Sequence, residues 1–263
     1  MLSIDLKNAY YRSPEHSVLD RVSLELVPGE FVVIIGTNGC GKSTLLKCLT
    51  GLHAAFEGKL ELDGRMLANW PLLERAERIA YLPQSVTPAF SFTAEEVILL
   101  SGYHRNDAVA AKKEAARLKQ VAEVMNVGSL LPRAVDELSG GEWQRVAIAR
   151  TVMQDARLLL LDEPTAHLDL SHRLALFHNC RRWARAGKGV LCATHDLDAA
   201  LEYADRIVVL HQGRVEADGV PAQVMTEPMI QRVFGETRIR ILSNPLSACP
   251  QLVIDSREVK GCR

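Results

Sequence analysis

A glycine-rich turn follows directly on a short apolar run, and this junction constrains the fold more than any other feature of the chain. The apolar run, Phe31-Val32-Val33-Ile34-Ile35, is β-branched and is typical of a strand that is buried on both faces. Similar runs occur at 158–161, 190–194 and 206–210. Helical stretches separate these runs, and strands that alternate with helices predict an α/β fold with a parallel sheet and crossover helices.

Other segments have different patterns. Polar and apolar residues alternate at 59–64 and 214–219, which is typical of half-exposed antiparallel strands. Residues from about 93 to 156 have helical periodicity, and a capping box, Thr93-Ala94-Glu95-Glu96, marks a helix start. We therefore expect a helical lobe inserted into the sheet domain. The expected organisation is a domain at 1–235 containing a helical subdomain at about 87–156, followed by an irregular or short-strand appendage at 236–263.

The glycine-rich turn itself, Gly36-Thr37-Asn38-Gly39-Cys40-Gly41-Lys42-Ser43-Thr44, fits the P-loop pattern. Glycines allow backbone amides to turn toward phosphates, and the helix expected near Lys42 directs its positive end at the same anion. Lys42 supplies a mobile charge for the β- and γ-phosphates, and the Ser43 hydroxyl is expected to ligate Mg²⁺. A plain glycine turn is the alternative, but the flanking patterns favour nucleotide binding. The residues expected at the nucleotide are Gly36, Asn38, Gly39, Cys40, Gly41, Lys42, Ser43 and Thr44.

Cys40 lies in this turn, beside the expected helix start. A helix N-terminus can depress a thiol pKa, and we expect alkylation of Cys40 to weaken ATP binding. The alternative is a small residue tolerated at a variable position. The six cysteines of the chain show no CxxC spacing, so we expect neither a zinc site nor a disulfide framework.

Two acidic residues, Asp162 and Glu163, follow the apolar run at 158–161. Ligands bind in the crevice at the carboxyl ends of parallel strands, so we expect Asp162 to hold Mg²⁺, through water, and Glu163 to act as general base toward the attacking water. A capped strand is the alternative for this pair taken alone. His195 follows the run at 190–194, and we expect it to contact the γ-phosphate.

A second glycine-containing segment, Leu138-Ser139-Gly140-Gly141-Glu142, precedes a helical pattern. Ser139 and Glu142 form the S-x-x-E capping box, and the two glycines leave the N-terminal amides of the helix uncovered. The segment therefore predicts a second anion site. A well-capped helix with a glycine entry is the alternative if the segment is taken alone.

The ordered set of motifs resembles the ABC (ATP-binding cassette) ATPases over nearly the whole chain. The motifs are the P-loop, Tyr81-Leu82-Pro83-Gln84, the LSGGE segment at 138–142, Leu160-Leu161-Asp162-Glu163-Pro164, His167-Leu168-Asp169 and His195. The resemblance implies an α/β P-loop NTPase with a RecA-like parallel-sheet core, an antiparallel β subdomain and an inserted helical subdomain. It implies ATP and Mg²⁺ as ligands and ATP hydrolysis as the activity.

The resemblance also implies roles for further residues. Gln84 would contact Mg²⁺ and sense the γ-phosphate, and Tyr11, next to Tyr10, would stack on adenine. Asp169 would link two sites across a dimer. A second copy of the chain would contribute its signature residues, Ser139, Gly140, Gly141 and Glu142, to the nucleotide held by the P-loop, in a head-to-tail pair. Trp143 and His167 depart from the residues more common in the family, and we expect Trp143 to affect packing near the coupling surface more than chemistry.

Two stretches are similar to the iron-chelate importers of this family, which carry ferric siderophores, haem or cobalamin. These are Leu99-Leu100-Ser101-Gly102-Tyr103-His104-Arg105 and the tail through Asn244-Pro245-Leu246 and Cys249-Pro250. The implied partners are a transmembrane permease and, indirectly, a periplasmic or lipoprotein substrate-binding protein. The implied location is the cytoplasmic face of the inner membrane.

Alternatives to an iron-chelate importer remain open at this point. They are an ABC ATPase acting on nucleic acid or the ribosome, a nucleotide-gated scaffold without hydrolysis, and an ATPase for a different transported substrate. With 31 basic and 32 acidic residues, the net charge of −1 gives no overall attraction to nucleic acid or anionic lipid. The N-terminus lacks a secretory signal pattern, and no apolar run approaches the roughly 20 residues of a membrane helix, so we expect another chain to form the channel.

Overall fold

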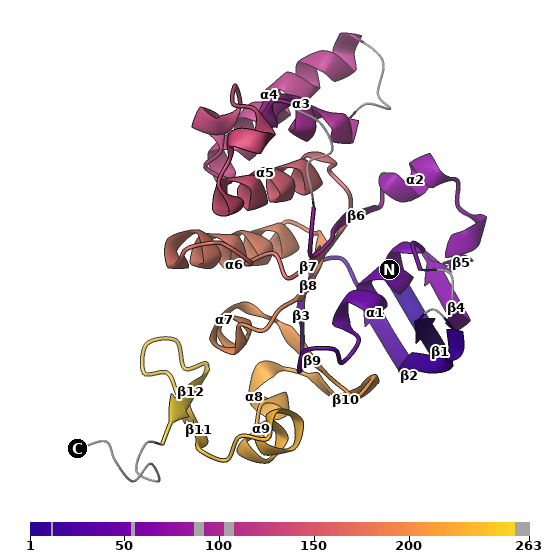
Figure 1. Ribbon diagram of the computed structural model, residues 1–263, viewed down its shortest axis with the longest axis vertical. Helices are drawn as coiled ribbons and strands as arrows, with labels where there is room; N and C mark the ends of the chain where they lie inside the picture. The colour runs from indigo at the N-terminus through magenta and orange to yellow at the C-terminus, as the bar shows by residue number, and fades with distance from the viewer. Residues whose placement is uncertain (12, 54–55, 87–91, 103–107, 256–263) are drawn as a thin grey trace.

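The computed structural model describes residues 1–11, 13–53, 56–86, 92–102 and 108–255; within these ranges the side chains of 6–8, 10, 11, 13–16 and 108–111 are not described. Six strands form the central sheet, in the order β10-β9-β3-β8-β7-β6 (Figure 1). Their bounds are β3 (Phe31–Ile35), β6 (Ile79–Leu82), β7 (Leu158–Asp162), β8 (Gly189–Ala193), β9 (Arg206–His211) and β10 (Arg214–Gly219). The four strands predicted from apolar runs are confirmed as parallel neighbours, and β10 pairs antiparallel with β9 at the edge.

The central sheet is covered on both faces, which explains why its strands are apolar at every position. In β3 all five side chains are buried; Phe31, Val33 and Ile35 belong to one core and Val32 and Ile34 to the other. Helices α6 and α7 lie on the first face, and α1 lies on the second (Figure 1). Their bounds are α1 (Lys42–Thr50), α6 (Leu170–Arg185) and α7 (Leu197–Tyr203).

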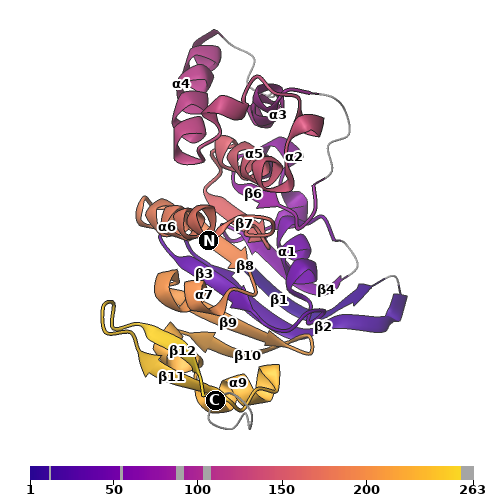
Figure 2. The ribbon, with the colours of Figure 1, turned by 60° about the vertical axis from the view of Figure 1, so that its left-hand side comes forward.

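A second sheet, entirely antiparallel, lies beside α1 (Figure 2). Its strand order is β2-β1-β4-β5, with β1 (Leu2–Tyr11), β2 (Ser13–Leu26), β4 (Phe56–Leu62) and β5 (Arg65–Met66). The predicted antiparallel strand at 59–64 is confirmed in β4, and Asp63 and Gly64, both with positive φ, form the two-residue turn to β5. The long hairpin of β1 and β2 was not predicted, although apolar and polar residues alternate strictly at 2–6 and 22–26, which was an available signal for it.

Helices fill the middle of the chain and lie together at one end of the molecule (Figure 1). The main ones are α3 (Ala94–Leu99), α4 (Ala108–Val124) and α5 (Gly140–Met153). The predicted capping box at Thr93 is confirmed: its hydroxyl accepts from Glu96 N, and the Glu96 carboxylate accepts from Thr93 N. Shorter elements are η1 (Leu67–Asn69), α2 (Leu72–Ala76), η2 (Leu100–Gly102), η3 (Gly128–Leu130) and η4 (Val135–Glu137). The division of the chain into subdomains at the stated boundaries stays a prediction.

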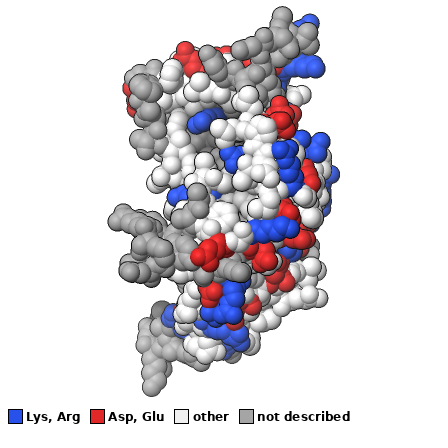
Figure 3. Space-filling model, turned by 90° about the vertical axis from the view of Figure 1, so that its right-hand side faces the viewer, with Lys and Arg blue, Asp and Glu red and all other residues white. Residues whose placement is uncertain are grey.

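The C-terminal part lies at the opposite end of the molecule and ends in a two-stranded hairpin (Figure 1). Its elements are α8 (Pro221–Val224), α9 (Glu227–Phe234), β11 (Ile239–Ser243) and β12 (Pro250–Ile254), so the short strands expected in the tail are present. None of the described helices combines the length and apolar character needed to cross a lipid bilayer. On the face shown in Figure 3, basic and acidic side chains are interspersed.

Candidate active site

The site is built at the edge of the central sheet where its parallel strands end. Strand β8 lies between β3 and β7, as expected for the strand before His195, and β6 follows β7. The segments that leave these strands begin with Gly36 after β3, Pro83 and Gln84 after β6, Glu163 after β7, and Thr194 after β8. Parallel register thus brings residues from four distant parts of the chain to one edge.

The P-loop connects β3 to α1, and its backbone needs glycine. At Gly36 φ is 155°, and a Cβ there would lie 2.1 Å from the carbonyl oxygen of Leu210 and 2.8 Å from Cys40 Sγ. Helix α1 begins at Lys42 as predicted, and no described side chain caps its first turn. The amides at this helix N-terminus are therefore available to an anion.

The P-loop is anchored from behind by Gly213, in the turn between β9 and β10. Gly213 N donates to the carbonyl of Cys40 at 3.2 Å, and the Gly213 carbonyl accepts from Asp20 N on β2 at 2.8 Å. Its φ is 79°, and a Cβ at this position would lie 2.3 Å from the carbonyl oxygen of Val18. One glycine therefore links the P-loop to both sheets.

A pocket of about 350 Å³ opens in front of the P-loop. Its lining consists of Val18, Asn38, Gly39, Gly41, Lys42, Ser43, Thr44, Gln84 and Glu163. Lys42 is only 7% exposed, and its Nζ donates to the carbonyls of Gly36 (2.9 Å) and Thr37 (3.2 Å). A buried ammonium group that relies mainly on neutral carbonyls fits an anionic ligand, which would be a stronger partner for this charge.

Asp162, at the end of β7, is fully buried and faces α1. Ser43 Oγ donates to its Oδ1 at 3.0 Å, and the Tyr81 hydroxyl donates to its Oδ2 at 3.4 Å. Burial is the main cause that raises the pKa of Asp162, and the hydrogen bond from Ser43 opposes the rise. A carboxylate paired with a hydroxyl at the foot of a phosphate pocket is a donor set that fits Mg²⁺.

Glu163 turns away from its neighbour Asp162. Its φ of 48° is left-handed, and its carboxylate points toward the P-loop and β8: Oε1 lies 4.0 Å from Lys42 Nζ, and Oε2 lies 2.8 Å from Nδ1 of His195. Because an ionised carboxylate only accepts hydrogen bonds, Nδ1 of His195 carries the hydrogen in this contact. Glu163 is 8% exposed and lines the pocket, whereas His195 is exposed at its rim.

The Ser139–Glu142 capping box is confirmed at the start of α5. Ser139 N donates to Glu142 Oε2 at 2.8 Å, and Glu142 N donates to Ser139 Oγ at 3.4 Å. The box leaves the amides of Gly140 and Gly141 without an acceptor among the described residues, and Ser139 and Gly140 are exposed. No residue at 139–142 lines the pocket of the P-loop described above. The segment predicted to bind a second anion is therefore exposed within one copy of the chain, apart from the pocket of the P-loop.

Asp169 caps helix α6 and contacts a residue that sequence reasoning missed. It accepts from His172 N (2.9 Å), Ser171 Oγ (2.8 Å) and His172 Nδ1 (2.8 Å), and these bonds, led by the one from His172 N, lower its pKa to about 2. The other ring nitrogen of His172 contacts Arg145 on α5. The spacing of three between Asp169 and His172 was the available signal for this contact.

Cys40 is 5% exposed, and burial raises the pKa of its thiol, although Lys42 acts in the opposite direction. Desolvation therefore outweighs the helix end, and the alternative of a small tolerated residue is favoured. The effect of alkylation on ATP binding stays a prediction. Cys48, Cys180, Cys192 and Cys249 are, like Cys40, free thiols. The side chain of Tyr11, expected at the adenine, lies outside the described residues, as do residues 103–105 of the importer-like stretch.

Known proteins resemble this chain in sequence and in structure. The model of the ABC transporter family matches residues 19–166, more than half of the chain. A hemin import ATP-binding protein HmuV of Rhodococcus jostii is 41% identical over 241 residues, which cover 92% of this chain and 82% of that protein. The HmuV protein of Nocardia farcinica is 42% identical over 253 residues, which cover 93% and 84%.

Among solved structures, a dimeric bacterial ABC transporter cassette superposes with a TM-score of 0.75 at 28% identity, covering 84% of this chain and 99% of that one. The RecA-like core, the antiparallel sheet and the helices at 94–153 follow the fold of these cassettes. Since the family model, the relatives and the fold agree, this chain belongs to the ABC transporter family, in which it is an ATP-binding and ATP-hydrolysing subunit.

Proposed function

We propose that this ATPase energises the import of hemin through a separate membrane permease. The observation that carries the proposal is that hemin import ATP-binding proteins from several bacteria match the chain at 37–42% identity over most of their length. Among the substrates that sequence resemblance left open, ferric siderophore, haem and cobalamin, these relatives favour haem.

Within one copy, the pocket around Lys42 is the proposed site of the triphosphate. Lys42 exchanges its carbonyl partners for phosphate oxygens, and the amides at the start of α1 bind the same groups. Ser43, Asp162 and Gln84 would hold Mg²⁺, which supplies charge neutralisation on the phosphates. Burial of Asp162 and its bond from Ser43 support this assignment.

Glu163 is the proposed general base. Its carboxylate takes a proton from the attacking water while the water oxygen forms its bond to the γ-phosphorus and the bond to ADP breaks. His195 holds one carboxylate oxygen of Glu163, which leaves the other directed into the pocket near Lys42. His195, which is exposed at the rim, is the proposed contact to the γ-phosphate as well.

A second copy of the chain is proposed to complete each site. Ser139, Gly140 and Gly141 are exposed or half-exposed on the outside of one copy, where their amides can bind the γ-phosphate held by the partner's P-loop. Glu142 supports this loop through the capping box, and Asp169 lies in the segment next to it. The dimeric state of a solved cassette with the same fold supports the pairing of two copies, for which a head-to-tail arrangement is proposed.

Further partners follow from the proposed import. A permease would carry the substrate across the inner membrane, with this subunit bound at the cytoplasmic face, and a periplasmic or lipoprotein binding protein would deliver the substrate. The names of the hemin import relatives support the association with import. The structure of this chain supports only the ATP-hydrolysing part of such a complex.

The experiment is a growth test under iron limitation in the source bacterium. A strain lacking this chain should fail to grow on hemin as sole iron source, and the wild-type gene should restore growth while Glu163→Gln should not. Growth on a ferric siderophore and cobalamin uptake serve as the substrate controls. Loss of siderophore or cobalamin uptake with normal growth on hemin would contradict the proposed substrate.

A further inference from the structure

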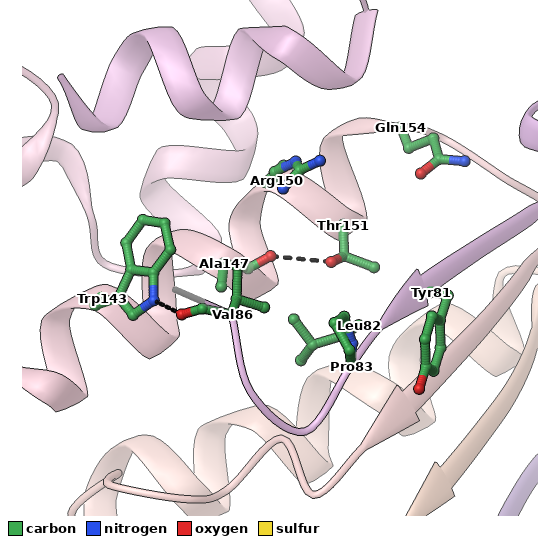
Figure 4. A pocket seen from close by; sticks show the side chains of 9 residues that line it. All are labelled: Tyr81, Leu82, Pro83, Val86, Trp143, Ala147, Arg150, Thr151 and Gln154. Atoms are coloured by element: carbon green, nitrogen blue, oxygen red, sulfur yellow. Dashed lines mark hydrogen bonds between the residues drawn. The ribbon is translucent and has the colours of Figure 1, made fainter. Parts of the chain in front are cut away.

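One side chain holds the segment that carries Gln84 to helix α5. After β6 ends at Leu82, the chain leaves the sheet, and Trp143 Nε1 donates to the carbonyl of Val86 at 2.6 Å (Figure 4). In the described part of the chain, no other hydrogen bond reaches Gln84, Ser85 or Val86. Among the described residues, this bond is therefore the one hydrogen bond that ties the segment to α5.

Trp143 also belongs to the helix that presents the signature segment. It is the fourth residue of α5, and its own backbone N–H donates to the carbonyl of Ser139 at 2.8 Å. Its ring is half-buried and packs, together with Val86, against the core under α5. Figure 4 shows the indole and Val86 at one end of a small pocket of about 160 Å³, away from Gln154. Partial burial limits competition from water for the hydrogen bond.

Gln84 lies two residues before Val86 and lines the pocket of the P-loop. Two residues span at most about 7 Å, so a shift of Val86 is transmitted to Gln84 almost directly. The indole is rigid, with only two side-chain torsions, and it fixes its partner carbonyl more narrowly than a long flexible side chain would.

We propose that Trp143 is a positioning residue for hydrolysis: by fixing the Val86 carbonyl, it holds Gln84 in the wall of the phosphate pocket and ties that position to helix α5. The inference rests on the proposed function, because the role of Gln84 in hydrolysis is part of it. The side chain that departs from the residue more common in the family thus acts on chemistry through another residue, and not only on packing.

The test replaces Trp143 with Phe in the full chain, which keeps an aromatic ring and removes the donor. Loss of one hydrogen bond of this kind predicts a fall in kcat for ATP hydrolysis of about two- to tenfold. The KM for ATP should change by less than about twofold, because Lys42 and the P-loop amides are untouched. An unchanged kcat would overturn the proposal.

Trp70 provides a matched control in the same chain. Its Nε1 donates to the carbonyl of Leu62 at 3.3 Å in the antiparallel sheet, at a site that does not line the pocket of the P-loop. Trp70→Phe likewise removes an indole hydrogen bond, here a longer one, and it should leave kcat unchanged. An equal loss of kcat in both variants would mean that Trp143 acts only through stability.

Two further measurements separate positioning from other effects. In a Gln84→Ala background, Trp143→Phe should have no further effect on kcat; the same loss in both backgrounds would contradict action through Gln84. In wild type, the indole N–H of Trp143 should exchange with solvent more slowly than that of free tryptophan, because it donates to the Val86 carbonyl. Exchange as fast as in free tryptophan would show that the tether is absent. The exchange readout needs no hydrolysis, so it still tests the tether if the proposed role of Gln84 fails.

Discussion

Helices α1 and α5 both begin at glycine-containing turns, yet their N-termini are completed in opposite ways. At α1 no described side chain caps the first turn, and the surrounding pocket contains Lys42, Ser43 and Glu163 from the same copy. At α5 the first turn is capped by Ser139, and the glycines face outward. Under the proposed function, affinity for nucleotide belongs to the α1 end, whereas the α5 end contributes only when a second copy approaches it.

The largest expected effect concerns the chemistry at the α1 end. Glu163→Gln keeps the shape of the side chain and removes the base, so kcat should fall by about 10²- to 10⁴-fold while ATP still binds. Steady-state phosphate release measures the loss, and light scattering after gel filtration should detect a dimer that forms only with ATP. Hydrolysis at the wild-type rate would break the comparison, because the α1 end would then lack the catalytic group assigned to it.

Lys42→Ala should have the next largest effect, on binding. Removing one charge-assisted contact to phosphate predicts a loss of ATP affinity of about 10- to 150-fold by titration calorimetry. The matched comparison is Ser139→Ala measured on the monomer, which should bind ATP as wild type does because Ser139 does not line this pocket. Equal losses in the two variants would place both helix ends at one nucleotide within a single copy.

Ser139→Ala should act on dimer formation. In the Glu163→Gln background, we expect the ATP-dependent dimer to weaken by about tenfold, the value of one lost hydrogen bond to phosphate. The substitution also removes a helix cap, so Thr93→Ala, which removes the equivalent capping box of α3, is the control for lost capping alone. If Thr93→Ala weakens the dimer as much, the effect is one of stability.

The smallest expected effect is a pH dependence at Asp169, beside the α5 end. Hydrogen bonds lower its pKa in the folded state to about 2 from 3.8. The unfolded chain therefore binds a proton more readily than the folded chain, so this contribution to stability is present above pH 3.8 and is lost as pH falls toward 2. The free energy of unfolding, followed by circular dichroism, should fall less steeply with pH between 3.8 and 2 in Asp169→Asn than in wild type. An identical slope would contradict the lowered pKa of Asp169.

The central sheet was predictable because each of its buried strands is a continuous apolar run in the sequence. Phe31–Ile35 is apolar at every position because both of its faces are covered. The capping box at Ser139 was also predictable, because its two partners lie three residues apart in the sequence. The contact from Trp143 to Val86 joins residues 57 positions apart, and no local pattern reports such a bond. The raised pKa of the Cys40 thiol is a similar case, because it results from burial by the rest of the fold, which the local pattern at the helix start does not report.

Gly213 shows how far the control of a ligand site can lie from the ligand. Its amide holds the phosphate-binding loop at Cys40 and its carbonyl holds β2, so the turn restrains the loop. Such restraint reduces the conformational entropy that binding would otherwise cost. Replacement of Gly213 by alanine would force its backbone away from Val18 and weaken its hold on the P-loop, although residue 213 does not line the phosphate pocket. A loss of ATP affinity would then trace to a turn some 170 residues downstream, in a strand pair that no inspection of the P-loop motif would single out.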